Sequence, residues 1–436
     1  MSSTGQGSAS SGEAFVIGTD APLASVVSFD AAISSIDAID ANGNSVSLLS
    51  SAQTVDFARY NGLQTLLDMN EVPADTYTQI AVTFSGATIG YLQTSAGSAP
   101  TIQTMTASFT TPTVTVTLAN PLVVAQTGPV GIRMDFRLDQ SIQVSGGEIT
   151  GQVNPTLDIT AVGPDSPGGY IDEFIAGVVS VDQTGQSFVI QGPHGRNFTV
   201  DVSGQTQWDD GSTLAELTST SIVQISGTID KADSTIDADE VLVLSQDGFY
   251  AAGTTTYVDS ANVPPDSFQF YVRGTLPASG DGVTLGQIAQ VNLSGNEKYY
   301  IYWMHNRFTQ FFFNRSTLLA GQHIAVGGSL TGAANGQALS VNRIVLRGWG
   351  FNGTIVPGSV NLNNGTFQMQ IDGFAGVLIP QTVTVYTADG TSYRDGFGGL
   401  DDVSVGTNVR AVGLLLMDPT SGDTILLARY VDNMDN

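Results

Sequence analysis

Hydrophobic and polar residues alternate along most of the chain with a period of two, which indicates strands with one buried face. The clearest run is Thr113-Val114-Thr115-Val116-Thr117-Leu118. The same alternation recurs at residues 188–191, 198–202, 367–371 and 382–386. Asx-Gly pairs, a strong signal for tight hairpin turns, separate such runs at Asn42-Gly43, Asn335-Gly336 and Asn364-Gly365. Short helices are expected only at residues 60–69 and 212–217. The pattern therefore predicts an all-β protein.

The second half of the chain repeats itself. A Pro/Gly-rich segment at residues 163–169 predicts the first domain boundary. Beyond it, the pattern T-x-aromatic-x-D-G occurs twice, with Trp208 and Tyr393 as the aromatic residues. A strand that ends in glycine follows each copy, at 222–227 and 408–413, and a similar strand occupies 321–328. Such repetition is typical of a scaffold rather than a catalytic unit.

We expect five segments from this organisation. A flexible tether at residues 1–13 precedes an N-terminal β-sandwich at 14–164. Three small β-barrel or β-sandwich modules follow, at 170–246, 247–347 and 348–432.

Composition excludes several classes of function. The chain has 436 residues, with 14 Lys and Arg against 40 Asp and Glu, for a net charge of -26. This deficit of cations argues against nucleic-acid binding and against a polybasic membrane patch, since both need clustered positive charge. The absence of Cys excludes disulfides, thiolate metal sites and a cysteine nucleophile. A hydrophobic content of 41% is enough for packed cores.

Several segments of the first half resemble DUF4382, a bacterial domain of unknown function. They are Thr19-Asp20-Ala21-Pro22-Leu23, Val72-Pro73-Ala74-Asp75-Thr76-Tyr77-Thr78-Gln79-Ile80, Asp135-Phe136-Arg137-Leu138-Asp139 and Asn154-Pro155. Asp75 stands where this family usually has glycine. The resemblance covers roughly residues 14–164 and carries no catalytic residues with it.

The repeats resemble a second family, DUF5666. Gly177-Val178-Val179-Ser180-Val181-Asp182 fits its opening pattern, whereas the middle copy fits less well. The combination of the two families implies a bacterial envelope lipoprotein. With the Ser/Gly-rich start of the chain, it leads us to expect a signal peptide in the natural precursor and a lipidated Cys at the position of Met1. The expected location is extracytoplasmic: outer membrane, cell surface or periplasm.

The sequence offers little catalytic chemistry. His194, His305 and His323 fall far apart, and neither a G-x-S-x-G elbow nor a phosphate-binding glycine loop occurs. Acidic turns could bind Ca²⁺ through hard oxygen ligands, although Asp-Gly pairs more often simply make turns. The acidic candidates are Asp209, Asp210, Asp395, Asp401 and Asp402. No other cofactor is expected.

The most unusual segment, residues 297–314, holds eight of the 36 aromatic residues. A two-residue turn at His305-Asn306 would make it a hairpin with two aromatic faces. One face suits a core. The other would carry the candidates for binding a partner: Lys298, Tyr300, Tyr302, Arg307, Phe311 and Phe313. That face either forms a platform for a sugar or protein, or is covered by a neighbouring module.

These features predict a non-enzymatic protein of the cell envelope with a structural, adhesive or binding role. Its partners would be proteins or glycans at the cell surface, and it would meet the membrane only through a lipid anchor. The alternative is a carbohydrate-binding protein that uses the aromatic hairpin. A glycan-active enzyme is a third hypothesis, because facing carboxylate pairs cannot be recognised from sequence.

Overall fold

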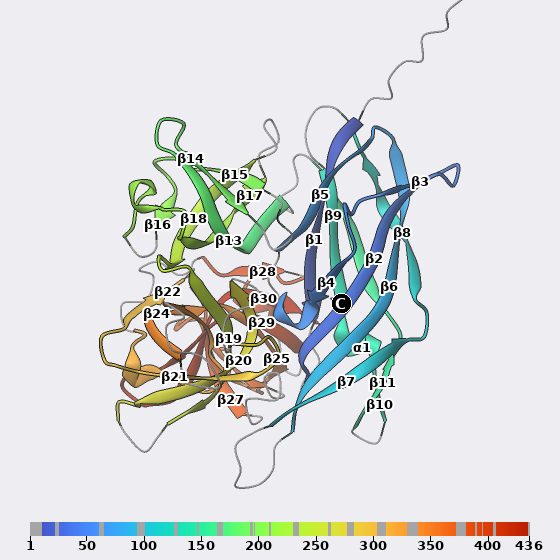
Figure 1. The fold of residues 1–436 in the computed structure, drawn as a ribbon. Coiled ribbons are helices and arrows are strands. Elements are labelled where there is room, and N and C mark those ends of the chain that lie inside the picture. The colour runs from blue at the N-terminus through green and yellow to red at the C-terminus, as the bar shows by residue number, and fades with distance from the viewer. Residues whose placement is uncertain are drawn as a thin grey trace, which may run out of the picture.

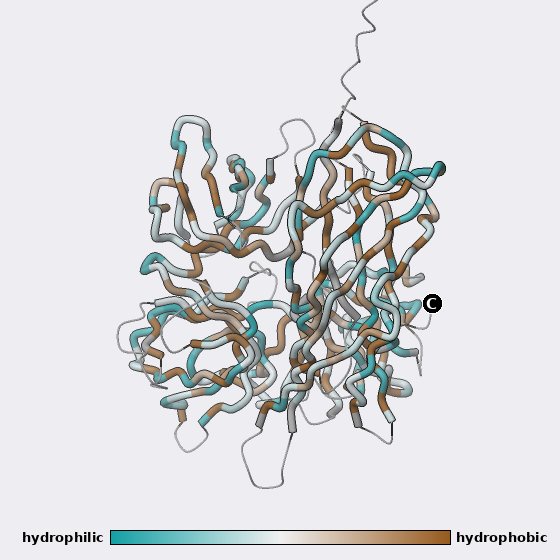
Figure 2. The backbone as a smooth tube through the Cα atoms, turned by 45° about the vertical axis from the view of Figure 1, so that its right-hand side comes forward, coloured by the Kyte–Doolittle hydropathy of each residue, from teal (hydrophilic) through white to brown (hydrophobic). Residues whose placement is uncertain are grey.

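The protein is built almost entirely of strands, as Figure 1 shows for the computed structural model. The all-β fold class is confirmed. The structure describes the following residues: 11–21, 26–60, 65–93, 101–125, 130–145, 148–163, 169–191, 195, 197–208, 211–229, 235–259, 263–276, 283–302, 311–328, 339–371, 381–388, 390–394, 396–403 and 407–434. Hydrophobic positions are spread along the strands throughout these ranges rather than gathered in one segment (Figure 2).

The first unit consists of two sheets packed face to face. One has the order β12-β9-β1-β5, and the other runs β10-β11-β7-β6-β2-β3, with β4 and β8 paired to β2 and β6. The strands are β1 (Ser11–Ala21), β2 (Val26–Asp40), β3 (Ser45–Ser47), β4 (Gln53–Asp56), β5 (Thr65–Pro73), β6 (Thr76–Gln93), β7 (Thr101–Phe109), β8 (Thr113–Val123), β9 (Val130–Arg137), β10 (Ile142–Ser145), β11 (Glu148–Val153) and β12 (Leu157–Val162). Phe29, Phe84 and Phe136 pack together in the core between the sheets.

Local structure in this unit mostly follows the sequence pattern. In β8, Thr113, Thr115 and Thr117 are exposed and the intervening valines are half-buried, as alternation predicts. Asn42-Gly43 lies in the turn between β2 and β3, with Gly43 at a φ of 86°. The prediction of a short helix at residues 60–69 is wrong. The structure has a 3₁₀ turn, η1 (Phe57–Tyr60), and then β5, which pairs with β1 and whose Leu66 and Met69 are buried in an apolar cluster with residues of β13 to β18.

The described residues beyond the sandwich form three six-stranded sheets with one common topology. Their strand orders are β15-β14-β13-β17-β18-β16, β21-β20-β19-β23-β24-β22 and β27-β26-β25-β29-β30-β28. In each sheet the first listed strand also pairs with the fifth, in parallel, which closes five strands into a small barrel. We call these barrels, each with its sixth strand, the first, second and third modules.

The strands of the modules are as follows. The first has β13 (Tyr170–Asp182), β14 (Ser187–Gln191), β15 (Asn197–Asp201), β16 (Gln207–Trp208), β17 (Ile222–Ile229) and β18 (Ile236–Ser245). The second has β19 (Phe249–Val258), β20 (Ser267–Leu276), β21 (Ile288–Asn292), β22 (Lys298–Ile301), β23 (His323–Gly328) and β24 (Leu339–Arg347). The third has β25 (Trp349–Ile355), β26 (Thr366–Ile371), β27 (Gln381–Tyr386), β28 (Ser392–Arg394), β29 (Asn408–Met417) and β30 (Thr424–Asn433).

The sequence repeat corresponds to equivalent places in these sheets. Trp208 lies in β16 opposite Val241 of β18, and Tyr393 lies in β28 opposite Val431 of β30. Both short strands are the sixth of their sheet and pair in parallel with the fifth. A single 3₁₀ turn follows each, η3 (Leu214–Glu216) and η5 (Leu400–Asp402). The short helix expected at 212–217 is thus present as η3.

The units share buried apolar contacts instead of standing apart. Phe15 and Ile17 of the sandwich belong to the core cluster of the first module. A cluster on the outside of the barrels joins Leu244 of the first module, Tyr250 of the second and Val412 of the third. Accordingly, the modules lie against one another and beside the sandwich in Figure 1. No helix among the described residues is long and apolar enough to cross a membrane.

Candidate functional site

The aromatic segment does not form the expected hairpin at its described end. Lys298–Ile301 is strand β22, which pairs in parallel with β24, so that Tyr300 lies opposite Val345. Residues 303–310, which include Arg307 and the expected turn, lie outside the described residues. Pairing with β24 puts β22 at the position that β16 and β28 hold in the other modules.

The candidate rings divide between two buried clusters, which contradicts the expectation that they share one face. Tyr302 is 2% exposed and packs with Leu242 and Leu244 of the first module. Phe311 and Phe313 are each 7% exposed and belong to the core of the second module. Phe311 also meets Tyr386 of the third module, with ring centroids 5.2 Å apart. A neighbouring module therefore contacts Tyr302 and Phe311, as expected if these rings do not form a platform, whereas Phe313 packs against Tyr299 of its own module.

Tyr302 joins two modules by a polar contact as well. Its hydroxyl hydrogen-bonds to the hydroxyl of Ser226 in β17, and Ser226 is fully buried. Nearby, Tyr300 is half-buried, and the guanidinium carbon of Arg343 lies 4.7 Å from the centroid of its ring. Arg343 in turn donates a hydrogen bond to the carbonyl oxygen of Val243. These side chains hold the first module against the second.

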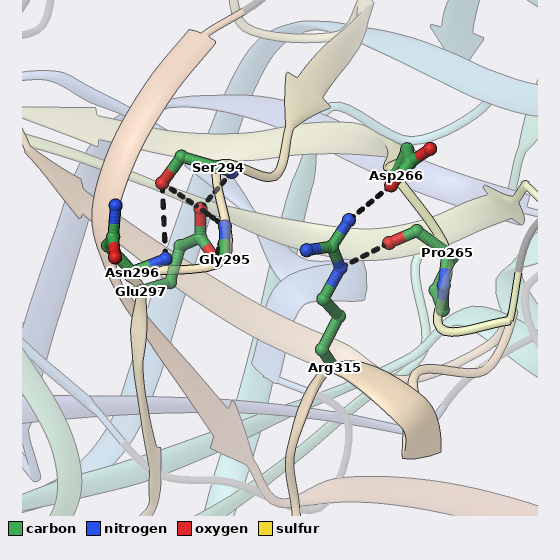
Figure 3. A network of polar contacts seen from close by, with 7 residues as sticks. All are labelled: Pro265, Asp266, Ser294, Gly295, Asn296, Glu297 and Arg315. Carbon is green, nitrogen blue, oxygen red and sulfur yellow. Dashed lines mark hydrogen bonds and ion pairs between the residues drawn. The ribbon is translucent and has the colours of Figure 1, made fainter.

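Among the described residues of the segment, Lys298 and Phe312 are exposed, Phe312 by 45%. Beside them, a polar network fixes three loops of the second module (Figure 3). Arg315 donates to the carbonyl oxygen of Pro265 at 2.6 Å and pairs with Asp266. Glu297 accepts hydrogen bonds from the Ser294 hydroxyl at 2.8 Å and from the Gly295 amide at 3.1 Å.

The charge of Glu297 is stabilised by this loop. Burial would raise its pKa, but the hydrogen bonds from Ser294 and Gly295 prevail and hold the pKa below its ordinary value. The hydrogen bonds to Glu297 therefore require its ionised carboxylate, and they hold the loop of Ser294 and Gly295 in one conformation.

The acidic turns do not assemble a metal site among the described residues, where no group of three or more acidic or histidine side chains could hold an ion. Asp209, Asp210 and Asp395 lie outside the described residues. Asp401 and Asp402 are exposed in η5, and Asp402 accepts a hydrogen bond from the Gly398 amide at 2.7 Å. That bond is the one an acidic turn makes with its own backbone.

His323 is buried in the second module, and its ring meets that of Trp349 edge-on at 4.3 Å. His194 and His305 lie outside the described residues. Trp349 also contacts Arg273, whose guanidinium carbon is 4.7 Å from the ring centroid. Trp349 begins the third module, so this stack links two modules.

Sequence reasoning missed a charged contact where Arg273 of β20 meets the sandwich. Its guanidinium lies 3.9 Å from a carboxylate oxygen of Asp56 in β4, and the Arg273 side chain is 1% exposed. Asp56 lies directly opposite Asp30 of β2. Burial, then the charge of Asp56, raises the pKa of Asp30 to about 7, although Arg273 acts in the opposite direction. We call Asp30, Asp56 and Arg273 the sandwich joint.

A second electrostatic interaction of this kind links the sandwich to the third module. Asp135 of β9 lies opposite Asp158 of β12, and burial raises the pKa of Asp135 against the effect of Arg410 in β29. Arg410 is itself 6% exposed. In both places an aspartate of the sandwich is matched to an arginine of a module. One signal was available in the sequence, namely an arginine such as Arg273 at the end of the apolar run Phe270-Tyr271-Val272.

Comparison with known proteins adds one finding to this geometry. No curated protein matches the chain. A family model does match the sandwich: residues 12–154 correspond to the family described as "Domain of unknown function (DUF4382)".

Proposed function

We propose that the protein is a non-enzymatic, extracytoplasmic component of the bacterial cell envelope, held there by a lipid, with a structural or binding role. The observation that carries the structural role is the burial between units. Tyr302, Phe311 and Arg273 each occupy a contact between two units, although the sequence had made Tyr302 and Phe311 candidates for binding a partner. The buried contacts favour a rigid body that presents its outer strands and loops to partners.

Support for the envelope location comes from the match of residues 12–154 to DUF4382 and from the likeness of the repeats to DUF5666. The low content of Lys and Arg is consistent with this location, because a protein with few cations has no basic surface for binding nucleic acid. The carbohydrate platform has less support than it had from sequence alone, since three of its six members are buried.

The test is to locate the native protein in its own host. We expect it in the envelope fraction of lysed cells, released by detergent and not by salt, because a lipid and not charge would hold it. Protease treatment of intact cells then distinguishes an outward-facing protein from a periplasmic one. Recovery in the cytosolic fraction would overturn the proposal.

A further inference from the structure

The two aspartates of the sandwich joint lie on the outer surface of the sandwich, where the second module covers them. Phe29 points into the sandwich core, so the alternation of β2 aims its neighbours Ser28 and Asp30 outward. Ser28 is nevertheless only 5% exposed, because the hydroxyl of Tyr271 in β20 donates a hydrogen bond to it at 2.8 Å. The burial of Asp30 therefore depends on the docking of the second module.

Close approach at this point is built into the sandwich. A Cβ atom on Gly90, the β6 residue opposite Ser28, would lie 3.1 Å from the Tyr271 hydroxyl and collide with Ser28. Glycine thus makes room for the tyrosine. Docking in turn brings Arg273 to Asp56, whose other carboxylate oxygen accepts a hydrogen bond from the Phe29 amide at 2.8 Å.

The paired aspartates make this contact sensitive to protons. Like charges directly opposite each other on neighbouring strands repel, and burial strengthens that repulsion. The titratable and charged groups that face the joint are Asp30 of β2, Asp56 of β4, and Tyr271 and Arg273 of β20. His323 of β23 contacts Trp349, the ring over which Arg273 lies. A proton on Asp30 removes the repulsion while Asp56 keeps its contact with Arg273.

We propose that the sandwich joint is a proton-dependent latch, which holds the N-terminal sandwich on the second module more tightly in mildly acidic than in alkaline surroundings. The raised pKa of Asp30 gives the sign. A carboxyl whose pKa is higher in the docked than in the undocked state takes up a proton on docking, so docking weakens as pH rises toward 7.

The size of the effect follows from the same linkage. If the pKa of Asp30 returns to its ordinary value of 3.8 on undocking, docking is about 30-fold tighter at pH 5.5 than at pH 8.5. A variant that cannot ionise at position 30 keeps the tight form at both pH values.

Hydrogen exchange of the full-length protein tests the latch locally, in peptides that cover β4 and β20. After correction for intrinsic exchange rates, we expect wild-type protection to fall on the order of 30-fold between pH 5.5 and pH 8.5. Asp30→Asn should remove this fall and stay protected at pH 8.5. Asp37→Asn is the matched control: it lies on the same strand opposite Ser47 instead of a second carboxylate, and it should behave as wild type.

Asp56→Asn is a second variant that also breaks the pair, and its amide oxygen can still accept the Phe29 amide. It should reduce the pH dependence without removing it, because the burial of Asp30, which raises its pKa most, remains. The proposal is wrong if Asp30→Asn and Asp56→Asn both retain the wild-type fall in protection, which would assign the titration to another group such as His323. It is equally wrong if wild-type protection in β4 and β20 does not change between the two pH values.

Discussion

Replacement of Tyr302 by alanine tests whether the contact between the first two modules is as tightly closed as its burial indicates. The ring is 2% exposed among Leu242, Leu244 and Val345, and its hydroxyl bonds to Ser226. Truncating a fully buried aromatic side chain costs about 3–5 kcal/mol, of which the lost hydrogen bond accounts for about 1 kcal/mol. We therefore expect Tyr302→Ala to lower the free energy of unfolding by about 3–5 kcal/mol and Tyr302→Phe by about 1 kcal/mol.

Urea unfolding followed by circular dichroism measures these changes. Phe312→Ala is the control, because it truncates an aromatic residue of the same segment that is 45% exposed, and we expect a loss below about 1 kcal/mol. The reasoning fails if Tyr302→Ala and Phe312→Ala unfold at the same urea concentration. That result would mean that the first and second modules separate in solution and leave Tyr302 accessible to a partner.

Three further predictions concern other contacts. A Cβ on Gly327 would collide with the Leu244 carbonyl oxygen of the first module, so Gly327→Ala should cost about 1–3 kcal/mol in the same unfolding assay, whereas Gly177→Ala, with open space around it, should cost far less. Arg394 donates two hydrogen bonds of 2.6 and 2.9 Å to the buried Asp432, so Arg394→Lys should lower the free energy of unfolding by about 1.5–3 kcal/mol. Arg137→Lys, at the more exposed pair with Asp158, is the control, and an equal loss of stability in the two variants would refute this prediction. Glu297 has a lowered pKa, so its stabilisation is present above pH 4.5 and is lost as pH falls below it; thermal melting should show Glu297→Gln less stable than wild type at pH 7, with the gap closing toward pH 3.

Short-range patterns predicted the strands well because alternation is a local property. Residues 188–191 and 367–371, for example, lie in β14 and β26. The glycine of each repeated strand also has a short-range cause, although the strands continue past it to Ile229 and Met417. At Gly227 and Gly413 a Cβ would collide with the carbonyl oxygens of Asp237 and Leu427 on the neighbouring strand, beside a shift in strand register.

Contacts between distant strands were beyond the sequence pattern. Alternation shows that β22 has two faces but does not show that β24 is its partner, so a hairpin was expected where a parallel pairing occurs. The aspartate pair of the sandwich joint requires the register of β2 against β4, and its arginine comes from 217 positions beyond Asp56 in the numbering. Side chains that contact another unit are the ones whose burial a strand pattern cannot assign.

The shared apolar cluster on the outside of the barrels limits how many copies of the module this chain can carry. Repeat arrays usually tolerate gain or loss of a copy, provided that the terminal copies have polar outer faces. Here Leu244, Tyr250 and Val412 meet in one cluster, and the sandwich covers the first module through Phe15 and Ile17. Deleting any module would expose apolar surface on its neighbours, and an inserted one would find no matching face. We therefore expect the three copies and the sandwich to be inherited as a set, and duplication or loss of a single module to be selected against.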